Sequence, residues 1–185
     1  MWVEENGMME RKMEPKKRVM AKKKSTSPVS VKPKASQPKA PSGYWLLKSE
    51  PDAFSWEMCK SRGAKGEPWT GVRSFQARNH MKAMQLGDLG FFYHSNEGKE
   101  IVGIVKVIKL AHPDGEDDTG TWECVDVAAV CDVPTPVTLA AAKANPKLSK
   151  MALVTSMRLS VQPVLPDEWK EVCRMGGLDP KKIKV

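Results

Sequence analysis

Trp69 is the residue whose type and setting point most directly to ligand binding. It stands in PWTGVR, residues 68–73, a segment that is rich in turn-forming residues and lacks the periodicity of a helix or a strand. A bulky aromatic side chain on a loop beside a glycine is better suited to line a ligand site than to fill a core. The segment therefore predicts a ligand wall at Trp69, with Gly71, Val72 and Arg73 next to it.

A group of polar side chains stands where a short apolar strand over residues 44–49 is predicted to end. Lys48, Ser49 and Glu50 place an ammonium, a hydroxyl and a carboxylate at this point, from which binding residues often emerge. An exposed polar cap is the alternative interpretation. Lys48 and Ser49 fall on opposite faces of the strand, which argues against a direct Ser–Lys catalytic dyad.

A second polar group, His94-Ser95-Asn96, follows a predicted strand over residues 89–94. An asparagine amide can read the edge of a nucleobase with two hydrogen bonds. This strand end is therefore a further candidate binding position.

A helix is predicted to begin near Ser74 and to end before Gly87. Ala77, Met81 and Met84 recur at helical spacing and predict one buried stripe. The N-terminus of this helix offers free N–H groups to an anion. The polar side chains that accompany it are Arg73, Arg78 and Asn79.

The sequence lacks the common signatures of catalysis and of metal binding. It has no P-loop, no dinucleotide-binding glycine motif and no nucleophile elbow. His80, His94 and His112 share no metal-ligand spacing, so neither a metal nor another cofactor is expected. The acidic run at 112–120 is interpreted as a solvated loop. The four cysteines show no CxxC spacing and are expected to be reduced thiols of an intracellular protein.

The 185-residue chain has a net charge of +8, most of which lies in its first 42 residues. Residues 1–42 hold 11 Lys and Arg against 4 Asp and Glu, whereas residues 43–185 hold 19 against 18. Lys, Pro and Ser dominate this part, so we expect 1–42 to be a disordered basic tail, attracted to nucleic-acid phosphate or merely solubilising. MAKKK at 20–24 resembles a translation start, which leaves open whether residues 1–19 are translated. No apolar run reaches the roughly 18–20 residues of a membrane span, and no membrane partner is expected.

The predicted elements place the candidate residues on one α+β domain over residues 43–185. Strands are expected at 44–49, 89–94, 101–110, 121–131 and near 161–165, and helices after Ser55, Ser74 and Thr138 and over 167–175. The long central strands follow one another directly, which favours antiparallel pairing. The fold that fits best is a small, mostly antiparallel β-barrel with helices packed outside.

Four segments taken together resemble the EVE domain family. They are YWLLKSEP at 44–51, WTGVRSFQARN at 69–79, GDLGFFYHSN at 87–96 and MRLSVQPV at 157–164. The resemblance covers about 44–175 and implies a PUA-like fold related to YTH and ASCH domains, in agreement with a small barrel with flanking helices. One departure is Ser74-Phe75, where relatives often have Asn-Tyr, which puts one polar contact in doubt.

The resemblance implies a reader that takes a modified base, notably modified cytosine such as 5-methylcytosine in DNA, into an aromatic-lined pocket. Trp69 would then stack on the base, and Trp69→Ala should remove the base preference while leaving the fold nearly intact. The other residues that the resemblance assigns to the pocket are Lys48, Ser49, Glu50, Gly71, Val72, Arg73, Asn79, His94, Ser95, Asn96 and Arg158.

Two alternatives to a DNA reader remain open at this point. PUA-like domains commonly bind structured RNA, and ASCH relatives include small amidohydrolases that act on acylated cytosine. The expected partner is nucleic acid with a modified base, held further by the basic tail on the phosphate backbone. The expected location is the cytoplasm, and association with the nucleoid is the alternative.

Overall fold

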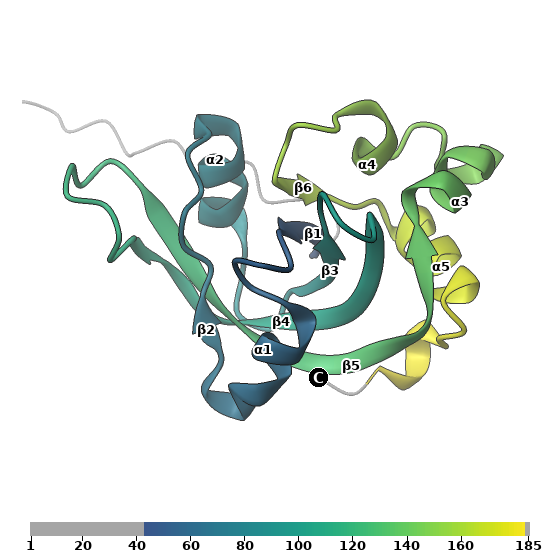
Figure 1. Cartoon of the computed structure of the whole chain (residues 1–185), viewed down its shortest axis with the longest axis horizontal. Helices are drawn as coiled ribbons and strands as arrows, with labels where there is room; N and C mark the ends of the chain where they lie inside the picture. Colours follow the sequence, from purple (N-terminus) through teal and green to yellow (C-terminus); the bar gives the residue numbers. More distant parts are fainter. Residues whose placement is uncertain (1–42, 184–185) are drawn as a thin grey trace, which may run out of the picture. The chain divides into compact units, whose positions relative to one another are not determined.

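One mixed sheet of six strands organises the computed structural model, which describes residues 43–183 (Figure 1). The basic tail expected over 1–42 lies outside these residues. The strands are β1 (Tyr44–Ser49), β2 (Glu67–Pro68), β3 (Leu89–His94), β4 (Glu100–Pro113), β5 (Glu123–Thr138) and β6 (Val161–Pro163). Their order across the sheet is β2-β5-β4-β3-β1-β6.

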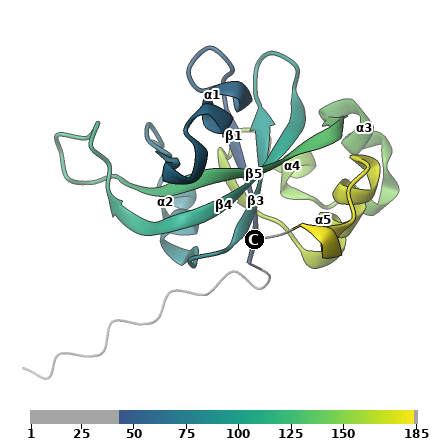
Figure 2. The same cartoon turned by 90° about the horizontal axis from the view of Figure 1, so that it is seen from below.

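The pairing is antiparallel everywhere in this sheet except between β1 and β3, so the prediction of a small, mostly antiparallel α+β fold is confirmed. The parallel register places Ser49 beside His94 and thereby brings two predicted polar groups to the same edge. Register shifts interrupt the β4–β5 ladder at four places. Such irregularities bend strands, and Figures 1 and 2 show β4 and β5 curving around the shorter strands. Within residues 43–183 the edge strands β2 and β6 do not pair, so the barrel is open.

Helices cover both faces of this sheet. They are α1 (Trp56–Ser61), α2 (Phe75–Ala83), α3 (Leu139–Ala144), α4 (Ala152–Thr155) and α5 (Pro166–Met175), with single 3₁₀ turns at η1 (Gly63–Lys65), η2 (Pro146–Leu148) and η3 (Pro180–Lys182). Three begin at hydroxyl side chains that accept a hydrogen bond from the first turn, as predicted: Ser55, Ser74 and Thr138. Every helix within residues 43–183 is too short or too polar to span a bilayer.

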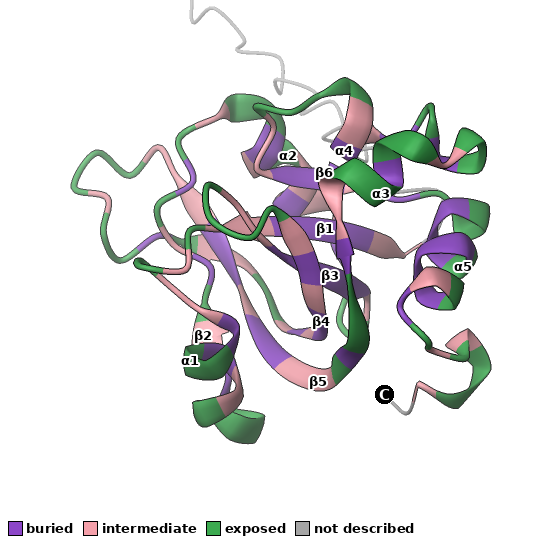
Figure 3. Ribbon diagram, turned by 45° about the vertical axis from the view of Figure 1, so that its right-hand side comes forward, coloured by how far each residue is buried: buried purple, intermediate pink, exposed green. Residues whose placement is uncertain are grey.

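Two apolar cores lie on the two faces of the sheet, because successive strand residues point to opposite sides. Leu47 and Phe92 join one core together with α2, and Leu46 and Phe91 join the other together with α5. The predicted stripe of α2 is fully buried in the first core. Figure 3 shows the buried residues along the central strands and on the side of α5 that faces them.

Several boundaries differ from the prediction. β4 and β5 extend well beyond their predicted ends, because both continue through polar or proline residues that usually end a strand. Val137, for example, pairs with Ile101 although Pro134 and Pro136 precede it. The short elements β2, α4 and the 3₁₀ turns were not predicted, since two to four residues carry too little periodicity. The four cysteines are free thiols, as predicted, and three of them are buried.

Candidate binding pocket

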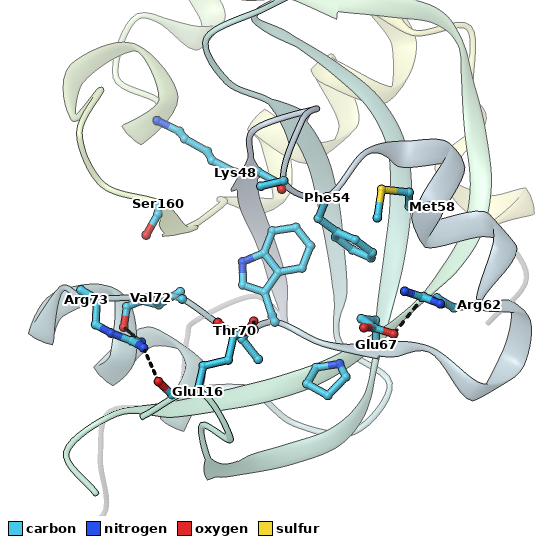
Figure 4. A pocket seen from close by; sticks show the side chains of 15 residues that line it. Lys48, Phe54, Met58, Arg62, Glu67, Thr70, Val72, Arg73, Glu116 and Ser160 are labelled. Carbon is cyan, nitrogen blue, oxygen red and sulfur yellow. Dashed lines mark hydrogen bonds and ion pairs between the residues drawn. The ribbon is translucent and has the colours of Figure 1, made fainter. Parts of the chain in front are cut away.

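A cleft of about 440 Å³ opens where the end of β1, helix α1 and the loop after β2 meet (Figure 4). Its volume falls in the range of small-molecule sites. Phe54, Met58 and Val72 give it apolar surface, and Thr70, Arg73 and Ser160 give it polar surface. The remaining lining residues are Lys48, Ser49, Ala53, Arg62, Glu67, Pro68, Trp69, Gly71 and Glu116.

Trp69 lines this cleft, but it is held in the core rather than standing free on a loop. Its side chain is only 5% exposed. The indole packs edge-to-face on Phe92, with ring centroids 5.3 Å apart, and on Phe54 at 5.9 Å. Its backbone N–H donates to Val125 O at 2.7 Å. Trp69 is therefore a fixed aromatic floor with a structural role as well, whereas the sequence predicted a loop side chain that packing does not need.

The loop that follows Trp69 is held by Asp114, whose side chain is buried. The carboxylate accepts hydrogen bonds from Gly71 N–H at 3.2 Å and from Arg73 Nη1 at 2.7 Å. It also accepts one from the Glu116 N–H at 2.9 Å. Burial acts to raise the pKa of Asp114, but the hydrogen bonds from Arg73 and the two backbone N–H groups outweigh it and lower the pKa. The acidic run was interpreted as a solvated loop, and for Asp114 this interpretation is wrong.

Two more contacts join the acidic loop to the rim of the cleft. Thr70 Oγ1 donates to Glu116 Oε1 at 3.0 Å, and Arg73 Nη2 donates to Glu116 O at 3.3 Å. Gly71 has φ +76°, a left-handed conformation that favours glycine over other residues. The sharp backbone turn at Gly71 and the Asp114 carboxylate together fix the loop between Trp69 and Arg73.

Lys48 and Ser49 leave β1 in different directions, as the alternation of the strand predicted. Lys48 Nζ donates to Met157 O at 2.9 Å and lies 5.7 Å from the centroid of the Tyr93 ring. Burial lowers the pKa of this ammonium to about 8. Ser49 Oγ donates instead to Glu50 O at 3.4 Å. Figure 4 shows the Lys48 ammonium pointing away from Phe54.

Half of the predicted site residues lie together in the lining of the cleft. These are Lys48, Ser49, Trp69, Gly71, Val72 and Arg73. The other half lie outside that lining: Glu50, Asn79, His94, Ser95, Asn96 and Arg158. Of this second set, Glu50, Asn79, Asn96 and Arg158 are exposed.

His94 and Ser95 support the cleft from behind. His94 Nε2 accepts the Trp56 N–H at 3.1 Å, and its ring packs edge-to-face on Phe92 at 5.6 Å. Burial lowers the pKa of His94, while the negative charge of Glu100 opposes that change. The Ser95 N–H donates to Ser49 O at 2.8 Å. His94 therefore holds the start of α1, and Ser95 holds the end of β1.

Several residues that line or support the cleft were missed by reasoning from the sequence alone. Phe54 precedes the short helix α1 and Met58 lies within it, where apolar residues usually indicate packing. Asp114 and Glu116 lie in a run whose composition indicates a turn, and the Asp114 contact to its own residue i+2 is the signal of an Asx turn. The Asx-turn pattern does not indicate that the Asp114 carboxylate also accepts a hydrogen bond from the Gly71 N–H.

Comparison with known proteins agrees with this architecture. The family model "EVE domain" matches residues 43–175. Thymocyte nuclear protein 1 of Homo sapiens is 33% identical, over 75% of this chain and 76% of the relative. The crystal structure of a protein from Agrobacterium tumefaciens is 62% identical, with a TM-score of 0.72, over 77% of this chain and 99% of that one.

A further solved structure was determined together with nucleic acid. It is human thymocyte nuclear protein 1 in complex with DNA that contains 5-methylcytosine. This protein is 32% identical to the present chain, with a TM-score of 0.67, over 74% of this chain and 99% of that one.

Proposed function

The chain belongs to the EVE domain family, and we propose that its cleft binds one modified base, most specifically 5-methylcytosine in DNA. The observation that carries this proposal is the preformed cleft of about 440 Å³, which is lined by the largely buried Trp69 indole. The structure of the human relative with DNA containing 5-methylcytosine supports the choice of ligand.

The physical balance of such binding predicts modest selectivity. Extruding a base from a duplex costs a few kcal/mol, and stacking on an aromatic ring returns roughly 1–3 kcal/mol without regard to base identity. Discrimination must therefore come from polar groups at the base edge and from apolar surface for the added methyl, which contributes about 1–3 kcal/mol. Phe54, Met58 and Val72 offer that apolar surface in the cleft. We expect methylated DNA to bind roughly 10–100-fold more tightly than unmethylated DNA.

A binding role without turnover is favoured over an amidohydrolase by the directions of Lys48 and Ser49. Each forms its hydrogen bond with a different backbone carbonyl, Lys48 with Met157 O and Ser49 with Glu50 O. A serine nucleophile needs a base as its hydrogen-bond partner, and among the described residues Ser49 Oγ bonds Glu50 O and not Lys48.

Titration of the full chain with fluorescent oligonucleotides tests the proposal directly. Duplex DNA and single-stranded DNA are each tested with and without one 5-methylcytosine. RNA of the same sequence is tested with and without the same modification. We expect the tightest binding to the methylated DNA. Equal affinity for the methylated and unmethylated strands would contradict the proposal, and tightest binding to RNA would favour the RNA-binding alternative. Incubation with acylated cytidine, followed by mass spectrometry, tests for turnover.

We propose that the basic tail supplies most of the non-specific attraction to phosphate, because residues 43–185 are nearly neutral. Replacing Lys22, Lys23 and Lys24 by glutamine in the full chain should reduce the slope of log affinity against log salt. The expected reduction is roughly 0.9 for each phosphate that is no longer neutralised. The ratio of methylated to unmethylated affinity should not change. An unchanged slope, or a ratio that falls to one, would contradict this division of roles.

A further inference from the structure

A group of aromatic and arginine side chains, two of them exposed and two half-buried, lies beside the cleft. We call it the rim cluster and define it as Arg73, Phe75, Arg78 and Trp122. Phe75 opens helix α2 and is 60% exposed. Trp122 comes from the loop between β4 and β5, and its ring centroid lies 5.0 Å from that of Phe75, at an interplanar angle of 34°. Two segments distant in sequence thus join their rings at the surface.

The rim cluster is contiguous with the cleft through Arg73. This side chain lines the cleft, and its guanidinium carbon also lies 5.8 Å from the Trp122 ring centroid. A nucleotide next to one held over Trp69 would therefore meet the rim cluster. Phe75 and Trp122 belong to neither apolar core, so the packing of the two cores does not require this pair of rings.

Arg78 adds a positive charge to the rim cluster and, within residues 43–183, forms no ion pair with a carboxylate. Its guanidinium carbon lies 5.0 Å from the Phe75 ring centroid and 6.0 Å from that of Trp122. Nη1 donates to Thr121 O at 2.7 Å, whereas the buried Nε has no acceptor. Arg73, by contrast, is paired with Asp114 at 2.7 Å. Arg78 is thus held beside the rings with charge to offer to a phosphate.

We propose that the rim cluster is a second nucleic-acid subsite, in which an unpaired base next to the bound modified base stacks on Phe75 while Arg78 attracts the adjoining phosphate. This inference rests on the proposed function of the cleft. An aromatic ring accepts any base whose face is free, and faces inside a duplex are covered by neighbouring bases. The subsite should therefore add affinity without adding discrimination between bases, and it should favour a single-stranded flank over a paired one.

The test removes the flanking base and the phenylalanine separately and together. Single-stranded oligonucleotides with one 5-methylcytosine carry either a normal base or an abasic residue at the position before or after it. The full chain, Phe75→Ala and the control Leu165→Ala are titrated with each. Leu165 is 52% exposed and lies at the start of α5, outside the lining of the cleft. Thermal unfolding should show all three folded, because both replaced side chains are largely exposed.

The expected result is a coupling between Phe75 and one flanking base. The abasic residue should weaken binding to the original chain and to Leu165→Ala by roughly five- to hundredfold on one side. It should have little effect on Phe75→Ala. Arg78→Gln should lower the salt slope by about 1. The ratio of methylated to unmethylated affinity should stay the same in every variant.

Other outcomes separate the two proposals. If Phe75→Ala binds all strands as the original chain does, or is weakened by the same factor on normal and abasic strands, the stacking subsite is refuted. If the coupling is present but no chain distinguishes 5-methylcytosine from cytosine, the rim cluster stands as a general single-strand site and the proposed function of the cleft fails.

Discussion

Replacing Trp69 by leucine is expected to abolish the preference for 5-methylcytosine and to weaken binding of the modified strand. Loss of one base–aromatic stack removes roughly 1–3 kcal/mol of binding free energy. In the proposed complex the indole also supports the face of the base, so its loss would misalign the hydrogen bonds expected at the base edge. Titration with the methylated and unmethylated oligonucleotides measures both effects. A Trp69→Leu chain that keeps the full preference would show that the ligand lies elsewhere.

This substitution also costs stability, which corrects the expectation that the fold would be nearly unaffected. Trp69 is 5% exposed and packs on Phe92 and Phe54. Truncating a buried tryptophan to alanine costs about 3–5 kcal/mol, and leucine refills part of that volume. The matched control is Trp169→Leu, since Trp169 is also buried, in the core on the other face of the sheet. It should lower the melting temperature and leave the methyl preference in place.

Replacing Asp114 by asparagine is expected to lower both the free energy of unfolding and the affinity of the cleft. The buried carboxylate loses its charge, and Gly71 and Arg73 lose their shared anionic acceptor. A hydrogen bond to a charged group contributes roughly 1.5–3 kcal/mol. The Arg73 side chain is 41% exposed, so solvent screening reduces its share. We expect a total loss of about 1–3 kcal/mol, measured by urea unfolding at neutral pH.

The pH dependence of this loss follows from the lowered pKa of Asp114. A carboxyl group with a lower pKa in the folded state stabilises the fold above its unfolded pKa, near 3.8. That stabilisation disappears as the pH falls through the folded value. The difference between the original chain and Asp114→Asn should therefore be constant near neutral pH and shrink below about pH 4.

The control for Asp114 is a carboxylate of the same loop that is open to solvent. Asp118 is exposed, so Asp118→Asn should leave both stability and affinity nearly unchanged. Equal stability of the two variants at neutral pH would contradict an anchoring role for Asp114.

The elements that carry local signals were predictable from the sequence. Serine caps marked the starts of α1 and α2, and alternation marked the two faces of β1. The parallel pairing of β1 with β3 was not predictable, because the sequence pattern favoured antiparallel neighbours. That pairing is what brings Ser49 beside His94.

The candidate site was predictable only in part, because its walls come from distant segments. The segment around Trp69 was identifiable as an aromatic residue among turn formers. Asp114 lies 43 residues beyond Gly71 along the chain, and no local pattern links the two. Asn79 and Arg158 were polar residues in segments that carry the family resemblance, yet the fold exposes both outside the cleft lining.

The bond between Asp114 and Gly71 limits how this cleft can be redesigned. A library that varies only residues 70–73 would leave Asp114 unchanged. Most of its members would lose the hydrogen bond from residue 71 to Asp114, and with it the loop conformation that follows Trp69. Retuning the cleft for a bulkier cytosine substituent requires joint randomisation of 70–73 and 114–116. The β4–β5 hairpin would then serve as a second, adjustable wall.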